Sequence, residues 1–322
     1  MRRITITLAA IGAFFAAAAV ALRRLFRSRE DRDWTEVSGP GRTLTVDGVR
    51  LHYIEKAPPI GGDAPAIVML HGFGGNTFSF RYQMADLAQD YRCVAIDLKG
   101  FGYSERVDGG DYSLTEQARL MFAAMDQLGI EKASIIGHSL GGAVVLRMAA
   151  MYPDRVKHLV LAASVSGDKP VLGPRLGIFR PFMAPMAKLV AIASWRRLFY
   201  DTSRLDMETI RKAYITPARI RGSSNTVWEM WRDVRHDPQI PFRKITQPVL
   251  ILWAECERII PMPGRSLAFL QKHLPQARTI HIPRSGHMLL EEQPEACNAA
   301  IRSFMETGTV QESAQVVEEQ VA

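Results

Sequence analysis

Apolar residues follow two different spacings along most of this chain. Continuous apolar runs, which are typical of buried strands, alternate with stretches whose apolar residues recur at helical spacing. One such stretch, residues 114–128, follows a helix-start signal formed by Ser113 and Glu116. The six strand-like runs are AIVMLHG, RCVAIDL, ASIIGHS, HLVLAAS, PVLILWA and ARTIHIP. This repetition of strand and helix predicts an α/β fold with a mostly parallel sheet covered by helices.

Two segments depart from this alternation. Ahead of the first run, RTLTVDG and VRLHYIEK predict an antiparallel hairpin that turns at Asp47 and Gly48. From about Val165 to Pro241 the sequence shows no strand-like run and is instead helix-like and rich in Met, Phe, Trp, Arg and Pro. Because this segment separates two core strands, it is predicted to form either a lid or a second small domain.

The amino-terminal residues form a segment of their own. An arginine pair precedes an uncharged run from Ile4 to Leu22, and four arginines follow within residues 23–29. A helix of about 19 residues is roughly 28 Å long, which matches the hydrocarbon core of a bilayer. We therefore expect an uncleaved membrane anchor, whose orientation stays open because arginines flank both of its ends. The alternatives are a secretory signal cleaved after Ala21, with export of the remainder, and a helix that lies on the membrane surface.

These patterns divide the chain into five parts. Residues 1–30 form the hydrophobic anchor or signal segment, and residues 307–322 form a polar tail that is expected to fray. The core has two parts, residues 41–163 and 243–306, and the helical lid or cap of residues 164–242 lies between them.

Composition narrows the classes of function. The chain has 322 residues, of which 47% are hydrophobic and 23% charged, an ordinary globular composition. Its net charge of +7 gathers in residues 1–30 and 175–243 and accompanies no nucleic-acid motif, so we expect a membrane surface rather than nucleic acid as a partner. Cys93, Cys256 and Cys297 lack the close spacing of zinc or redox motifs. We therefore expect no metal and no other cofactor.

The segment IIGHSLGGAVVLRMAAMYP carries the strongest chemical signal. It places Gly137, Ser139 and Gly141 in a G-x-S-x-G pattern directly after an apolar strand and before a helix, which is the context of a nucleophile elbow. Such a turn is so tight that residues beside the serine must lack side chains, and it raises the hydroxyl above the carboxyl edge of the sheet. The backbone N–H of Leu140 and the helix dipole point to the same place, so Leu140 is a candidate oxyanion donor.

Two further loops complete the candidate site. The loop in MLHGFGGN is predicted to supply a second oxyanion donor, the backbone N–H of Phe73, while His71 is expected to organise this loop rather than act as a base. His287, in IHIPRSGHMLLEEQP, is the candidate general base because it closes the order serine, acid, histidine along the chain. Structural or solvated roles are expected for His138, His158, His236 and His281.

The motifs HGFGG, DLKGFGYSE, GHSLGG, WAECERIIP and GHMLLEEQP follow one another in this order. In their sequence and spacing, residues 41–306 resemble the α/β-hydrolase superfamily. The resemblance implies an α/β-hydrolase fold, with a mostly parallel eight-stranded sheet flanked by helices and a helical cap inserted after strand six. It also implies that the third motif carries the nucleophile, the fourth the acid and the fifth the histidine, and that Asp97 shapes its loop. Relatives with aspartate at the elbow act as dehalogenases or epoxide hydrolases, whereas Ser139 favours ester-type chemistry.

The acid is the least regular part of this resemblance. The fourth motif of the family usually has the form W-G-x-x-D, and aligning Trp253 places Glu257 at the acid position and Ala254 at that of the glycine. A glutamate can fill this role, because its carboxylate can also fix the histidine tautomer and stabilise the imidazolium. Glu255 is expected to be a solvated loop residue. The rival acid is Asp168, just past the sixth strand, where some family members carry their acid.

We therefore predict a carboxylic ester hydrolase that forms an acyl-enzyme on Ser139, with His287 as general base and Glu257 as triad acid. The apolar and cationic residues of the lid segment, together with the anchor, favour a small lipophilic acyl substrate such as a monoacylglycerol. Thioesterases, carbon–carbon bond hydrolases, haloperoxidases and acyltransferases share the triad and stay open as alternatives. A further alternative is a membrane-tethered binding protein that has the fold without the activity. The sequence does not indicate an oligomeric state.

Overall fold

The computed structural model describes residues 30–37, 39–59, 64–167, 197–203 and 205–308, together with the isolated residues 17, 20 and 21. Most of the predicted anchor, residues 168–196 of the predicted lid and the tail from residue 309 lie outside the described residues. Within the described part of the chain, no helix is long and apolar enough to cross a membrane. The anchor and its alternatives therefore stay predictions.

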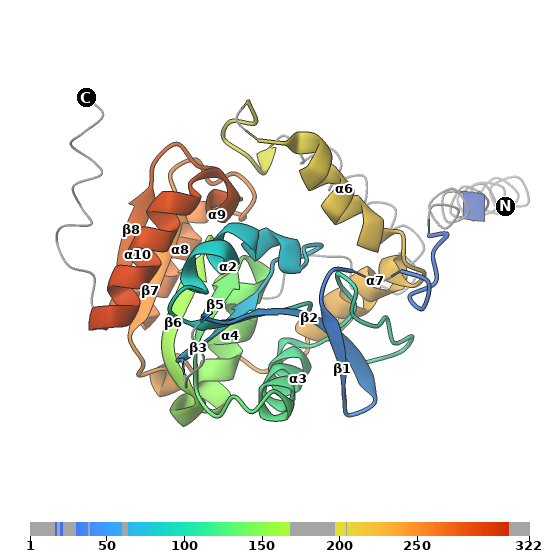
Figure 1. Ribbon diagram of the computed structural model, residues 1–322, viewed down its shortest axis with the longest axis horizontal. Helices are drawn as coiled ribbons and strands as arrows, with labels where there is room; N and C mark the ends of the chain where they lie inside the picture. Colours follow the sequence, from blue (N-terminus) through green and yellow to red (C-terminus); the bar gives the residue numbers. More distant parts are fainter. Residues whose placement is uncertain are drawn as a thin grey trace, which may run out of the picture.

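An eight-stranded sheet forms the centre of the molecule, as the sequence predicts (Figure 1). The strands lie in the order β1-β2-β4-β3-β5-β6-β7-β8, in which β2 is antiparallel to both of its neighbours and the pairs from β4 to β8 are parallel. Because β3 and β5 are neighbours, the loops that follow them meet at the carboxyl edge of the sheet. The strand bounds are β1 Arg42–Val46, β2 Val49–Lys56, β3 Ala66–Leu70, β4 Arg92–Ile96, β5 Ala133–His138, β6 Val156–Ala162, β7 Val249–Ala254 and β8 Ala277–Ile282.

Helices cover both faces of the sheet (Figure 1). Alternate residues of β3 belong to different cores, with Val68 and Leu70 on the face that packs with α3, α4 and α8, and Ile67 and Met69 on the face that packs with α2, α9 and α10. The bounds of these elements and of the short 3₁₀ helices are η1 Thr77–Phe80, α2 Arg81–Leu87, α3 Leu114–Gln127, α4 Leu140–Met151, η2 Pro153–Arg155, η5 Phe242–Lys244, α8 Pro263–His273, α9 Leu289–Glu292 and α10 Pro294–Thr307.

Local sequence signals position two of these elements as predicted. The turn residues between β1 and β2, Asp47 and Gly48, have φ angles of 47° and 79°. Positive φ at both central residues is the requirement of a type I′ hairpin turn, which Asp-Gly satisfies. At the start of α3, the Ser113 hydroxyl accepts a hydrogen bond from the Glu116 N–H at 3.1 Å. The predicted hairpin and this helix start are both confirmed.

The chain between β6 and β7, called the insertion below, contributes two described helices, α6 Met207–Ala218 and α7 Ser223–Val234. Both lie off the sheet (Figure 1). Side chains of α7 bind the loop between β4 and α3: Glu229 accepts the Gly109 N–H at 2.8 Å, and Asp233 accepts the Tyr112 N–H at 2.8 Å. Polar contacts therefore join the insertion to the core.

Candidate active site

The turn between β5 and α4 has the geometry of a nucleophile elbow. Ser139 has φ 53° and ψ −115°, a conformation that a non-glycine residue keeps only where its surroundings hold it. Its N–H donates to Ala162 O at 3.0 Å, and its C=O accepts the Gly142 N–H at 3.0 Å. Within the described structure the Ser139 side chain makes no capping bond to α4. The backbone of Ser139 is therefore fixed while its hydroxyl does not serve as a helix cap.

Packing at the elbow requires the glycines that the sequence places there. A Cβ on Gly137 would lie 2.5 Å from Gly141 O, and a Cβ on Gly141 would lie 2.1 Å from Leu70 O. Both distances are far below a van der Waals contact, so a side chain at either position would push α4 away from the strands. The steric reason for two glycines around Ser139 is thus the close approach of α4 to β3 and β5.

The two predicted oxyanion donors belong to different elements, Leu140 to the start of α4 and Phe73 to the loop after β3. Leu140 is the first residue of α4, so its N–H has no acceptor inside the helix. The loop after β3 reaches the serine from the other side, where a Cβ on Gly72 would lie 2.9 Å from Ser139 Cβ. Phe73 follows, with its side chain 43% exposed and its ring 5.5 Å from that of Phe101. The loop after β3 therefore passes close to Ser139 at Gly72, and the oxyanion roles of Phe73 and Leu140 stay predictions.

The contacts of His71 match its predicted role in organising this loop. Its buried ring accepts the Leu98 N–H at Nε2 at 3.1 Å, so the proton is on Nδ1, which donates to Gly72 O at 2.7 Å. Burial lowers the pKa of His71, which favours the neutral ring. Because backbone groups occupy both ring nitrogens, His71 has no nitrogen left to act as a general base.

Glu257 and His287 come together in the loops beyond β7 and β8. His287 Nδ1–H donates to Glu257 Oε2 at 2.7 Å, and both side chains are buried. Glu257 Oε1 accepts the N–H groups of Ile259 at 2.7 Å and Ile260 at 3.1 Å. Burial acts to raise the pKa of the Glu257 carboxyl, but the hydrogen bond and charge of His287 and the two amides outweigh it, so this pKa is lowered. An ionised carboxylate that holds Nδ1–H leaves Nε2 of His287 as the basic nitrogen.

The two other candidate acids are placed differently. Glu255 is exposed, and its Oε2 accepts the Arg284 N–H at 2.8 Å, which is a contact between two loops. Asp168 lies outside the described residues. Among the carboxylates that the structure describes, Glu257 is the one that bonds to the His287 ring.

His138, for which the sequence predicts a structural or solvated role, is buried beside the site and has a structural role there. Its Nε2–H donates to His287 O at 2.8 Å, and the two rings lie 4.9 Å apart. Burial, and then the charge of His287, lowers the pKa of His138 to about 3, so its ring is neutral. The residue before the nucleophile thus holds the backbone of the loop that carries His287. The sequence feature that could have pointed to His138 is its position directly before Ser139.

Asp97 shapes the loop after β4, which is the role that the family resemblance implies. Its carboxylate is fully buried and accepts the N–H groups of Thr77 at 2.6 Å and Tyr103 at 2.7 Å. His52 Nδ1 lies 2.8 Å from the same carboxylate. These contacts join the loop after β4 to η1 and β2 and involve both carboxylate oxygens of Asp97, so they support a structural rather than a catalytic role.

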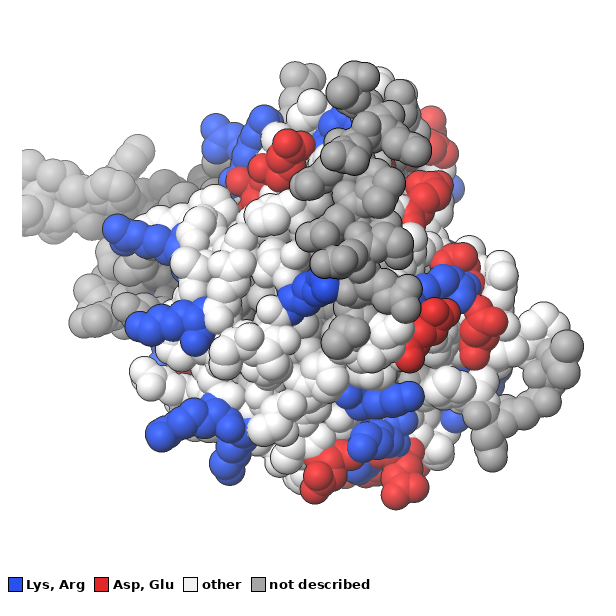
Figure 2. Space-filling model, turned by 90° about the vertical axis from the view of Figure 1, so that its left-hand side faces the viewer, with Lys and Arg blue, Asp and Glu red and all other residues white. Residues whose placement is uncertain are grey.

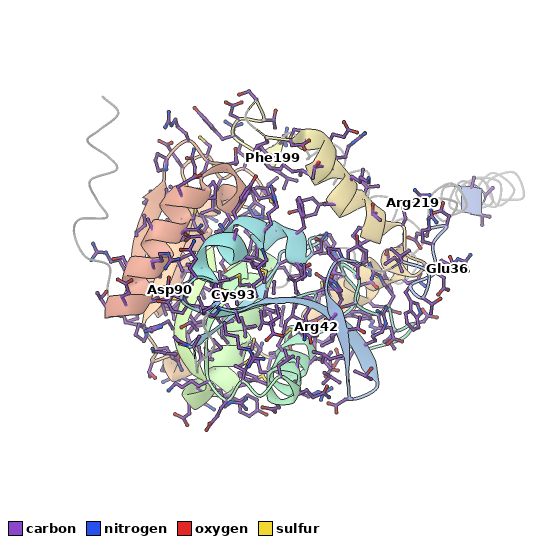
Figure 3. All side chains as sticks on the ribbon, viewed as in Figure 1. Glu36, Arg42, Asp90, Cys93, Phe199 and Arg219 are labelled. Atoms are coloured by element: carbon purple, nitrogen blue, oxygen red, sulfur yellow. The ribbon has the colours of Figure 1, made fainter. Side chains whose placement is uncertain are left out.

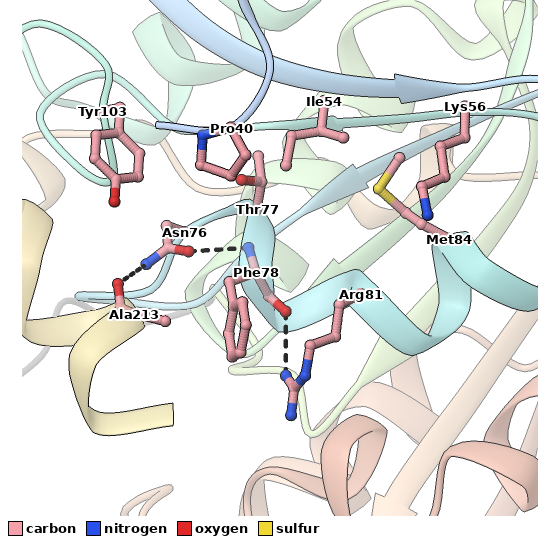
Figure 4. A pocket seen from close by; sticks show the side chains of 10 residues that line it. All are labelled: Pro40, Ile54, Lys56, Asn76, Thr77, Phe78, Arg81, Met84, Tyr103 and Ala213. Carbon is pink, nitrogen blue, oxygen red and sulfur yellow. Dashed lines mark hydrogen bonds between the residues drawn. The ribbon is translucent and has the colours of Figure 1, made fainter. Parts of the chain in front are cut away.

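A pocket of about 280 Å³ lies between β2, η1 and α6 (Figure 4). Asn76 joins its walls, because Nδ2–H donates to Ala213 O of α6 at 3.1 Å and Oδ1 accepts the Phe78 N–H at 2.9 Å. The lining residues are Pro40, Ile54, Lys56, Asn76, Thr77, Phe78, Arg81, Met84, Tyr103 and Ala213. They include neither the elbow nor the Glu257–His287 pair, so this pocket marks the junction of the insertion with the core rather than the reaction centre.

The arrangement suits nucleophilic chemistry by a serine. It combines a hydroxyl on a constrained turn, a histidine whose proton is held on Nδ1, and backbone N–H groups beside the serine. Within the described residues, no cluster of three or more His, Cys, Asp or Glu side chains could hold a metal ion.

The fold and this site define an α/β protein with a nucleophile elbow and a histidine–carboxylate pair. The family model of the alpha/beta hydrolase fold matches residues 65–294, and the chain belongs to that family.

Known proteins similar to this chain include three hydrolases. The uncharacterized hydrolase YugF of Bacillus subtilis (strain 168) is 28% identical over 282 residues, which cover 84% of this chain and 99% of that protein. Bifunctional epoxide hydrolase 2 of Sus scrofa is 40% identical over 312 residues, which cover 83% of this chain and 55% of the relative. The structure of 2-hydroxy-6-oxo-6-phenylhexa-2,4-dienoate hydrolase from Rhodococcus sp. strain RHA1 is similar with a TM-score of 0.67 and 25% identity, covering 82% of this chain and 98% of that one.

Proposed function

We propose that this protein is a serine hydrolase that cleaves carboxylic esters of lipophilic acyl groups, with monoacylglycerols as one such class. Ser139 Oγ attacks the acyl carbon while His287 Nε2 takes its proton, and the same proton then goes to the leaving alkoxide. Water, deprotonated by His287, then attacks the acyl carbon. The bond from this carbon to Ser139 Oγ breaks, Oγ takes the proton back from His287, and the carboxylic acid is released. The observation that carries the proposal is the 2.7 Å bond from His287 Nδ1–H to the buried Glu257 carboxylate, in a chain that also has a serine elbow.

The elbow residue favours acyl transfer over epoxide opening. The family's epoxide hydrolases have an aspartate at this position, whereas this chain has Ser139. A serine alkoxide is a good nucleophile toward an acyl carbon, and we propose that the N–H groups of Phe73 and Leu140 stabilise the oxyanion that forms there. The similarity to the pig epoxide hydrolase therefore supports hydrolase chemistry in general, and the serine supports ester cleavage in particular.

Apolar residues of the insertion support a lipophilic substrate. Phe199 and Ile210 pack with Met288, the residue after the proposed general base. The Met288 N–H also donates to Leu198 O at 3.0 Å, so the insertion contacts the histidine loop directly. An apolar cover at this place would exclude water from the reaction and accept an acyl chain. We propose that the insertion acts as this lid.

Activity should rise with the length of the acyl chain. Burial of one CH₂ contributes about 0.8 kcal/mol, so kcat/KM for p-nitrophenyl esters is expected to rise roughly three- to four-fold per CH₂ until the pocket is full. The measurement is hydrolysis of a series from acetate to palmitate, beside monoacylglycerols and acyl-thioesters. Equal rates for acetate and the longer esters would contradict a lipophilic acyl pocket.

Carbon–carbon bond hydrolysis is the second candidate, because the Rhodococcus dienoate hydrolase has the same fold at 25% identity. Labelling with a fluorophosphonate separates the classes. An activated serine that labels but turns over no ester or thioester would favour this second candidate, and a chain that does not label at all would favour the non-catalytic binding protein.

We also propose that residues 1–30 anchor the protein to a membrane. Full-length protein is expected to sediment with membranes, and deletion of residues 1–29 should give a soluble, active enzyme because it leaves Glu30 and the contacts of residues 30–32 with the insertion in place. Fractionation, amino-terminal sequencing and ester hydrolysis check this. Full-length protein that retains Met1 in the soluble fraction would exclude the anchor, and a new amino terminus at Leu22 would show signal cleavage instead.

A further inference from the structure

The chain that follows the apolar amino-terminal run is built into the insertion. Arg32 bridges to the turn between α6 and α7: its N–H donates to Arg219 O at 3.3 Å, and its C=O accepts the Arg221 N–H at 2.9 Å. The Asp31 carboxylate also pairs with the Arg219 guanidinium. Figure 3 shows Glu36 and Arg219 at the same end of the molecule. Residues 31–32 are therefore fixed to the insertion.

Glu30 supplies the cap that α7 lacks. The residue before α7 is Gly222, which has no side chain to cap the helix. The buried Glu30 carboxylate accepts the N–H groups of Ser224 at 2.9 Å and Gly222 at 3.3 Å, and it also accepts the Ser224 hydroxyl. A carboxylate at this position satisfies amides of the first turn and interacts favourably with the positive end of the helix dipole.

Chain length brings any membrane that holds the apolar run close to this end of the molecule. The run ends at Leu22, eight positions before Glu30. Eight fully extended residues span at most about 28 Å. A bilayer that contains the run must therefore lie within that distance of Glu30, and four of the intervening residues are arginines, which favour anionic headgroups.

The outer face of α6 has the chemistry of a membrane-surface helix. Arg211 and Lys212 are exposed, and Ile215, one turn later on the same face, is 49% exposed. Cations beside an exposed aliphatic side chain are typical of helices that lie in the lipid interface. Glu208, one turn before the cations, is also exposed and partly offsets their charge. The opposite end of the molecule shows basic and acidic side chains among broad uncharged areas (Figure 2).

We propose that the outer face of α6, defined by Arg211, Lys212 and Ile215, docks on an anionic lipid bilayer. The contacts of residues 30–32 hold the insertion next to Glu30, from which the chain continues back toward the membrane anchor. Docking places the insertion against the lipid phase that supplies a lipophilic substrate. This inference rests on the proposed membrane anchor and deepens it, since it assigns the face of the protein that meets the membrane.

The test measures contact with lipid directly in the full-length chain. A bimane fluorophore is attached to the Ile215→Cys variant in a Cys256→Ser background, since Cys93 and Cys297 are buried. The protein is mixed with vesicles of equal parts phosphatidylglycerol and phosphatidylcholine that contain a headgroup-linked nitroxide quencher. The matched control is Tyr152→Cys, which is 47% exposed at the other end of the core, just after α4. We expect quenching at position 215 and none at position 152.

Charge reversal tests the lipid chemistry. Arg211→Glu with Lys212→Glu should abolish the quenching at position 215, because each cation near an anionic surface contributes roughly five-fold in binding. The control pair, Arg243→Glu with Lys244→Glu, carries the same change on η5, ahead of the amino end of β7, and should leave the quenching intact. In vesicles of phosphatidylcholine alone, quenching at position 215 should be weaker.

The outcomes separate docking from the other proposals. Vesicle-bound protein with equal quenching at positions 215 and 152 would overturn the docking face and leave the anchor standing. Protein that does not bind vesicles at all would overturn both. Hydrolysis of a soluble p-nitrophenyl ester is measured in parallel. It should be unchanged in the charge-reversed variant, since the α6 face is separate from Ser139, His287 and Glu257. If the unmodified protein hydrolysed no ester, the proposed ester hydrolysis would be refuted, but the docking proposal would not be affected.

Discussion

Replacing Ser139 with alanine is expected to abolish turnover and leave the fold intact. The hydroxyl is the atom that attacks the acyl carbon, and the removal of such a nucleophile lowers kcat by about 10³-fold or more. Alanine keeps the Cβ that the backbone at φ 53° already accommodates, and Ser139 Oγ does not cap α4. Ester hydrolysis and fluorophosphonate labelling should both disappear, while the thermal unfolding midpoint should change little.

Ser134 provides the matched control on the same strand. It is also buried in β5, where its Oγ lies 3.0 Å from His158 Nδ1, but it is at the strand end away from the elbow. Ser134→Ala should therefore retain turnover, even if it lowers stability. Substantial esterase activity in Ser139→Ala would refute the nucleophile assignment.

Replacing Glu257 with glutamine should lower turnover by roughly 10² to 10⁴, because loss of the triad acid cost about 10⁴ in a serine protease. The structure supplies the reason for a large effect. One carboxylate oxygen accepts His287 Nδ1–H, and the other accepts the N–H groups of Ile259 and Ile260. A glutamine has only one oxygen, so its NH₂ must face a donor on one of these two sides. Either the histidine tautomer or the loop is then disturbed.

Two other variants of the same loop serve as comparisons for the loss of turnover in Glu257→Gln. Glu255→Gln should stay close to normal turnover, because Glu255 is exposed and contacts only a loop amide among the described residues. Glu257→Asp keeps the charge but is one methylene shorter, so it should retain more activity than Glu257→Gln if the loop moves inward. Near-normal turnover in Glu257→Gln, together with a collapse in Asp168→Asn, would transfer the acid role to Asp168.

The sequence determined the fold class and most of the candidate site through local patterns. Apolar runs located the six strands from β3 to β8, since a strand covered on both faces needs a continuous apolar run, and the turn signal at Asp47 and Gly48 located β1 and β2. Asp47 and Gly48 specified the hairpin turn, because few residues accept positive φ at both positions. The two glycines around Ser139 located the elbow, because only glycine fits where α4 approaches β3. Each of these signals is a short pattern of neighbouring residues, so it can be recognised in the sequence before the fold is known.

Tertiary structure decided which groups meet across long sequence separations. Glu255 and Glu257 are two residues apart, and only the fold shows that one side chain meets His287, thirty positions away, while the other meets the Arg284 backbone. His138 gave no chemical pattern of its own, yet its ring nitrogen binds the His287 carbonyl, 149 positions away.

The same holds for Glu30. The sequence pattern places this residue in the anchor segment, whereas in the structure it caps α7 by accepting the N–H of Gly222, which is 192 positions away. The physical reason is that a hydrogen bond depends on distances and angles between atoms, and for residues far apart in the chain these are set by the order of the strands and the packing of the insertion rather than by neighbouring residues.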